Sequence, residues 1–246
     1  AGLFRDVIRH RGNAESIAAL IKFARNSTQE DAAAGAIDAA RGCAIDQQAD
    51  VHVKDLVNLI KSTDSAKIRM AAEKTIHTII SESDKKASFE PNLYDIYKNT
   101  TDDNIKFTML RLLGTTGEDM ALDAIEDALK SGEPTDQAAA LAALSKWKND
   151  DQFPTLTAFI KNKDNKALRG KAFTTAYSFL GLERERESNH LRKLWTSLAD
   201  TAETQTEKRK IISGMAHLKH QWAIEILESY LKNEDDRIIE AAESAM

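Results

Sequence analysis

The sequence is poor in residues that break or cross-link a chain: its 246 residues include one cysteine, three prolines and ten glycines. The single cysteine, Cys43, excludes a disulfide within the chain and a cluster of metal-binding thiolates. Average usage would supply about 12 prolines and about 17 glycines. This shortage disfavours a β-sandwich or barrel, because their many tight turns depend on such residues. No apolar run approaches the roughly 18 residues of a membrane-spanning helix.

Familiar catalytic motifs are also lacking. The sequence contains no Gly-rich phosphate loop, no Gly-x-Ser-x-Gly motif and no Cys/His nucleophile pattern. His217 and His220 would share one face of a helix, but a metal site needs a further ligand, and we interpret them as surface histidines. We therefore predict no catalytic residue, no metal and no cofactor.

Alanine and charged residues are plentiful. There are 36 alanines, and alanine is the best helix former. The contents of 42% hydrophobic and 30% charged residues are typical of a globular protein. With 34 basic and 39 acidic residues the net charge is −5, which argues against a dedicated nucleic-acid binder because such proteins carry a basic surface. The composition thus favours an all-α protein.

One pattern recurs along the chain: an apolar helical segment ends in a cation, and a polar turn and an alanine-rich helix follow. Residues 56–61 (Leu-Val-Asn-Leu-Ile-Lys) and 156–161 (Leu-Thr-Ala-Phe-Ile-Lys) show the first part. A cation at that end suits the negative end of a helix dipole. The copies are 31 to 38 residues apart, and each predicts a pair of helices. The residues that close the first helices are Arg25, Lys61, Lys98, Lys130, Lys161, Ala199 and Lys232.

Side chains with capping oxygens stand just before the predicted second helices. They are Asp64, Asp102, Asp164 and Thr204, residue types that accept hydrogen bonds from the first free N–H groups of a helix. The apolar residues that follow recur at helical spacing. One helix pair cannot bury such a stripe alone, so we expect the pairs to stack on one another.

Two copies resemble the signature of HEAT repeats, a family of the armadillo-type helical superfamily. Residues 64–76 read Asp-x-x-x-Ile-Arg-x-Ala-Ala-x-x-x-Ile, and residues 164–172 repeat the Asp and an apolar-Arg pair. The short copies are similar to the bacterial HEAT-like class. The resemblance implies a right-handed α-α superhelix, or α-solenoid, of about seven stacked two-helix repeats. It also implies a ladder of hydrogen bonds between successive repeats, formed by Asp64, Arg69, Asp164 and Arg169.

We expect one HEAT-like domain over residues 1–246, with residues 1–12 as a partial repeat or a cap. The chain begins with Ala1 instead of Met and stops within a helical pattern at Met246. We interpret it as a piece of a longer protein, with the array truncated at its C-terminus. The compartment stays open between the bacterial cytoplasm and the periplasm or exterior.

The repeat predicts a non-catalytic scaffold for protein–protein interaction, because stacked helix pairs present an extended concave surface. By register, one exposed column on the second helices carries cations and polar residues that suit an acidic protein or peptide. We do not expect nucleic acid as the partner. The candidate binding residues are Lys74, Arg111, Thr174 and His217 in the column, with Lys146 and Lys208 beside it.

Two alternatives remain at this point. Some HEAT-like proteins are DNA glycosylases, which need a basic groove with exposed aromatic residues; we instead expect Trp147, Trp195 and Trp222 to pack between repeats. The second alternative is a structural module of a larger multidomain enzyme. HEAT-like metal hydroxylases carry His-Glu dipeptides, and this chain has none.

Overall fold

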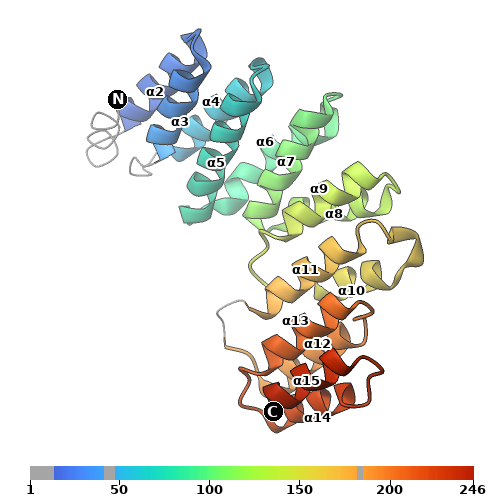
Figure 1. Cartoon of the computed structure of the whole chain (residues 1–246). Coiled ribbons are helices and arrows are strands. Elements are labelled where there is room, and N and C mark those ends of the chain that lie inside the picture. Colours follow the sequence, from blue (N-terminus) through green and yellow to red (C-terminus); the bar gives the residue numbers. More distant parts are fainter. Residues whose placement is uncertain (1–13, 42–47, 182–184) are drawn as a thin grey trace. The chain divides into compact units, whose positions relative to one another are not determined.

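A computed structural model describes residues 14–41, 48–181 and 185–246. The predicted cap at residues 1–12 lies outside this part of the chain. The described residues form helices and turns and contain no strand, so the all-α prediction is confirmed. The chain divides into two compact units, Ala1–Trp147 and Lys148–Met246, which we call the N-terminal unit and the C-terminal unit (Figure 1).

The N-terminal unit consists of helix pairs joined by short turns. In each pair the first helix packs against the second, and a short 3-10 helix, η1 (Lys86–Phe89), precedes the third pair. The pairs are α2 (Ala14–Asn26) with α3 (Glu30–Arg41), α4 (Ala49–Ser62) with α5 (Ala66–Glu82), α6 (Glu90–Asn99) with α7 (Asp103–Thr116), and α8 (Asp119–Lys130) with α9 (Pro134–Leu144).

The C-terminal unit repeats this arrangement. A 3-10 helix, η2 (Lys163–Asn165), interrupts its first pair between the two helices. The described residues thus contain the seven helix pairs that the repeat predicts, and the first helices end within two residues of the predicted closing positions. The pairs are α10 (Phe153–Lys161) with α11 (Arg169–Leu180), α12 (Ser188–Ala199) with α13 (Gln205–Met215), and α14 (Gln221–Tyr230) with α15 (Asp236–Ala245).

Within the N-terminal unit the second helices form a continuous row, in which α3 packs on α5, α5 on α7 and α7 on α9. Small side chains are buried on these helices, and Ala33, Ala72 and Ala140 have no exposed surface. Alanine therefore serves two purposes here, since it favours the helix and leaves room for the next one. None of the helices in the described segments has the length and apolar character that crossing a membrane requires.

Two of the four predicted helix caps are confirmed. Asp102 accepts hydrogen bonds from the first N–H groups of α7, and Thr204 forms a reciprocal capping box with Glu207 at the start of α13. The prediction for Asp64 is wrong by one residue, because Ser65 directly precedes α5 and its hydroxyl accepts from Ile68. Asp164 is also not a cap: η2 and the turn after it delay the start of α11 to Arg169.

Candidate functional site

Polar side chains on the second helices link one repeat to the next. The carboxylate of Glu73 on α5 accepts two hydrogen bonds from Arg111 on α7, 38 residues later. Lys106 on α7 forms an ion pair with Asp136 on α9, with 3.2 Å between Nζ and Oδ2. These separations are close to one repeat, since a residue on one second helix lies beside its counterpart on the next. The pairs hold charged groups at defined places on the second-helix surface.

A hollow of about 530 Å³ opens on this surface in the N-terminal unit. Four cations and one carboxylate line it, so it is basic although the whole chain is acidic. It contains three of the six residues that the sequence predicts for binding. We call it the N-terminal hollow, and its lining residues are Arg41, Met70, Glu73, Lys74, His77, Thr78, Arg111, Leu112 and Lys146.

Arg111 is rigidly held in this hollow. Its Nε and one terminal nitrogen lie 2.7 and 2.8 Å from the two oxygens of Glu73, and the same terminal nitrogen lies 3.1 Å from the hydroxyl of Thr108. Such a fork-shaped pair fixes both position and orientation. Because Glu73 neutralises Arg111, the guanidinium contributes shape and hydrogen-bond donors more than net charge.

The two lysines of the N-terminal hollow carry the positive charges that are not neutralised by a neighbouring carboxylate, whereas both arginines are paired. Lys74 and Lys146 are exposed, and neither has an ion-pair partner among the described residues. Arg41 lies 3.4 Å from Asp38 on its own helix, in a half-exposed pair that contributes little. Met70 adds an apolar element, since 55% of its surface is exposed. The hollow thus offers two free ammonium groups beside an exposed thioether.

The other three predicted binding residues belong to the C-terminal unit. Thr174 is exposed on α11 and accepts a hydrogen bond from Lys210, at 3.0 Å. Lys208 is half-buried on α13. His217 is exposed, but it lies in the turn after α13, which ends at Met215, and not on the helix face that its register predicts. The structure therefore brings Lys74, Arg111 and Lys146 together in the N-terminal unit. Thr174, Lys208 and His217 belong to the other unit.

The three tryptophans are buried, and one of the two neighbouring histidines packs against a tryptophan ring. Trp147, Trp195 and Trp222 are buried, with at most 7% of their surface exposed, so the predicted burial is confirmed. His220 stacks on Trp222 with 5.2 Å between the ring centroids. The described residues contain no group of three or more His, Cys, Asp or Glu side chains that could hold a metal ion.

The four residues assigned to the ladder differ in their contacts. Arg69 donates to the carbonyl of Thr63, at 2.9 Å, within its own repeat. Asp64 and Asp164 are exposed, and in the described ranges neither side chain takes part in a hydrogen bond or ion pair. Arg169 does contact the next repeat, but its partners there are Glu207 and Thr201, which the predicted ladder did not include.

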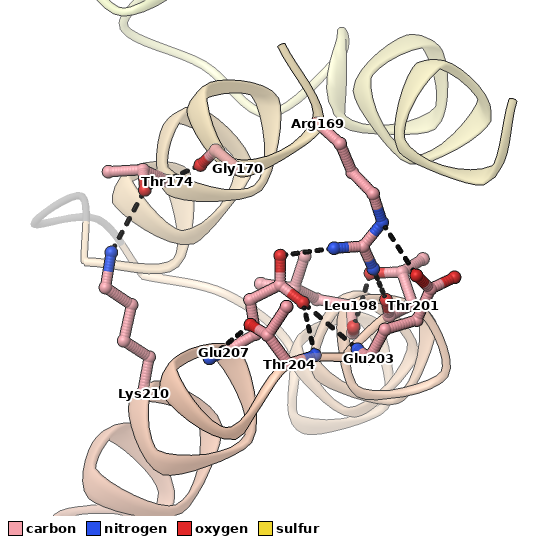
Figure 2. Close-up of polar contacts among 9 residues, drawn as sticks. All are labelled: Arg169, Gly170, Thr174, Leu198, Thr201, Glu203, Thr204, Glu207 and Lys210. Carbon is pink, nitrogen blue, oxygen red and sulfur yellow. Dashed lines mark hydrogen bonds and ion pairs between the residues drawn. The ribbon is translucent and has the colours of Figure 1, made fainter. Parts of the chain in front are cut away.

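Arg169 lies at the centre of a polar cluster in the C-terminal unit (Figure 2). Its guanidinium donates to Glu207 and to the carbonyl of Thr201, both in the next repeat. Glu207 also accepts from the backbone N–H groups of Glu203 and Thr204, at 3.0 Å each. Both Arg169 and Glu207 are at least nine-tenths buried. This buried ion pair joins α11 to the start of α13.

The surroundings of Glu207 act on its pKa in opposite directions. Burial alone would raise the pKa, but the hydrogen bond from Arg169, those from the Thr204 and Glu203 backbones and the charge of Arg169 together hold it below its usual value. The folded protein therefore favours the ionised carboxylate more strongly than the unfolded chain does.

We predict that acid weakens the C-terminal unit through Glu207. A lowered pKa in the folded state contributes stability above the ordinary glutamate pKa, and this contribution disappears as the pH falls through the folded-state value. In urea unfolding between pH 7 and pH 3, the free energy of unfolding should fall more for the wild type than for Glu207→Gln, because the glutamine cannot titrate. Equal losses in the two proteins would contradict this assignment.

Several residues of the N-terminal hollow were missed by the sequence analysis. Met70 and His77 lie on α5 four residues before and three residues after Lys74, and Glu73 directly precedes it; all three are on the side away from the buried apolar stripe. Extending the predicted column along that helix would have found them. Arg41 closes a different helix, and only the packing of α3 on α5 brings it to the same hollow.

The comparisons agree with this architecture. Residues 90–176 match the family described as HEAT repeats. Searches among curated proteins and among solved structures find no match to the chain. The matched region covers α6 to most of α11, and the helix pairs before and after it have the same organisation. Residues 90–176 therefore belong to the HEAT-repeat family, and the consecutive helix pairs on both sides of them continue the same all-α repeat architecture.

Proposed function

We propose that this protein is a protein-interaction scaffold and that an acidic segment of its partner binds in the N-terminal hollow. HEAT repeats are commonly protein-interaction scaffolds and are generally non-catalytic. The observation that carries the specific proposal is the concentration of four cations against one carboxylate in a hollow of a chain whose net charge is −5. Complementary charge of this kind selects partners and speeds association.

The lining suggests how such a segment is held. Lys74 and Lys146 attract carboxylates, and Arg111 is pre-oriented by Glu73 and donates hydrogen bonds without further ordering. Met70 provides an adaptable apolar contact for a side chain of the partner. An extended segment with two acidic residues and one apolar residue matches these groups.

Reversing the charges of Lys74 and Lys146 tests this proposal. Peptides selected from a random display library on the immobilised full chain should be rich in Asp and Glu. Their affinity, measured by fluorescence anisotropy, should fall by about tenfold or more in K74E/K146E, because two attractive charges become repulsive. The matched control is K22E/K61E, which changes the net charge equally at two exposed positions on first helices.

Two results would reject the proposal. One is a selection that yields peptides without acidic residues. The other is equal weakening by K74E/K146E and K22E/K61E, which would show a general charge effect and no site. A groove of the glycosylase kind is not proposed, because Trp147, Trp195 and Trp222 are all buried and cannot stack on a displaced base.

A further inference from the structure

The C-terminal unit contains a second basic hollow, of about 330 Å³. It lies where α10 ends and α11 begins, and none of its residues belongs to the N-terminal hollow. Four cations and one carboxylate line it, which repeats the charge balance of the first. We call it the C-terminal hollow, and its lining residues are Ile160, Lys161, Asn162, Lys163, Lys166, Arg169 and Glu203.

Arg169 has one donor without a proper acceptor. Its terminal nitrogens are bonded to Glu207 and Thr201, but its Nε is buried and makes no hydrogen bond within the described residues. Glu203 lies 3.3 Å from this Nε as an ion pair without hydrogen-bond geometry (Figure 2). A buried donor without an acceptor is unfavourable, so a better-placed anion at this point would be stabilising.

Glu203 is easily displaced from Arg169. Its side chain is 75% exposed, whereas that of Glu207 is only 7% exposed. The buried Glu207 already balances the charge of Arg169, and ion pairs with such an exposed partner contribute little. Glu203 therefore occupies a place that an incoming anion can take.

An incoming anion must carry more charge than the carboxylate that it replaces. A phosphoryl group has a charge of about −1.5 to −2 at pH 7 and three acceptor oxygens. Lys161, Lys163 and Lys166 are exposed around the hollow, and none of the three has an ion-pair partner among the described residues. The volume is at the lower end of the range of about 300–1,000 Å³ for ligand pockets, which suits one such group.

We propose that the C-terminal hollow binds the phosphoryl group of a phosphorylated protein segment. The lysines surround the phosphoryl oxygens, one oxygen accepts from Arg169 Nε, and Glu203 turns out to solvent. Glu203 thus acts as a competing internal anion, which keeps out single carboxylates and yields to a dianion. This site goes beyond the acidic-segment site in the N-terminal hollow, because it uses different residues and selects a different chemical group.

The test compares phosphoserine, serine and glutamate forms of one lysine-free peptide by fluorescence anisotropy with the full chain, and adds inorganic phosphate as competitor. Only the phosphoserine peptide should bind, and phosphate should displace it. Glu203→Gln should tighten binding by about three- to tenfold at low salt, because it removes the competing charge. K163E/K166E should weaken binding by about tenfold or more.

Matched variants separate this proposal from the first. K193E/K232E reverses two exposed lysines of the same unit outside the hollow, and K74E/K146E alters only the N-terminal hollow; both should bind the phosphopeptide as the wild type does. The proposal is overturned by equal binding of the glutamate peptide, by Glu203→Gln binding no tighter than wild type, or by duplex DNA binding where the phosphopeptide does not.

Discussion

Replacing Arg169 with methionine is expected to destabilise the C-terminal unit by about 3–5 kcal/mol, the usual cost of removing one partner of a buried ion pair. The variant leaves the carboxylate of Glu207 buried without its cation and the carbonyl of Thr201 without its donor. Methionine fills much of the same space, so the loss comes from unpaired polar groups and not from a cavity. The effect should exceed that of any exposed ion pair in this unit.

Hydrogen exchange of the α13 amides in the full chain measures this effect. Arg192→Met is the matched control, because it makes the same substitution in a pair with Glu225 at 2.9 Å whose side chains are half exposed. Arg192→Met should lower the stability of the C-terminal unit by less than about 1 kcal/mol. Changing Glu207 to leucine together with Arg169→Met should recover part of the loss, since no charge is then left buried. Equal effects of Arg169→Met and Arg192→Met would contradict the role of burial.

Gly114→Ala should lower the stability of the N-terminal unit by about 2 kcal/mol, although alanine is normally the better helix former by about 1 kcal/mol. A methyl group at Gly114 on α7 would lie 2.4 Å from the carbonyl oxygen of Ala143 and 2.7 Å from its Cα. These are backbone atoms of α9, so no side chain can rotate away. The two helices would have to separate, and the buried contact between them would weaken.

Gly35→Ala is the control for this prediction. Gly35 lies inside α3, and a methyl group there would have no neighbour within 4 Å. This change should therefore stabilise the protein by about 0.5–1 kcal/mol, the ordinary gain of alanine over glycine in a helix. Thermal and urea unfolding of the two variants should shift in opposite directions. If Gly114→Ala were instead more stable than the wild type, the backbone of α9 at Ala143 would not lie against Gly114, and the prediction would be wrong.

The repeat was predictable because its signals are local. Helix ends with a cation, such as Lys61 and Lys161, and caps such as Asp102 and Thr204 act within a few residues of the chain. The misplaced cap at Asp164 arises where η2 delays α11, a detail that the repeat pattern does not contain. The candidate site was predictable in part: register placed Lys74 and Arg111 on one face, whereas Arg41 reaches it from another helix.

The sequence by itself determined the seven helix pairs and the ends of their first helices, because helical periodicity, capping and dipole effects depend on neighbours in the chain. Only the tertiary structure decided which polar groups meet. The start of α8 has no capping side chain of its own, and Glu90 from the preceding repeat accepts from its Met120 and Ala121 N–H groups. Arg169 likewise finds Glu207 only because α11 and α13 are adjacent. Such partners depend on how the helices rotate and approach as they pack, and no local pattern records that geometry.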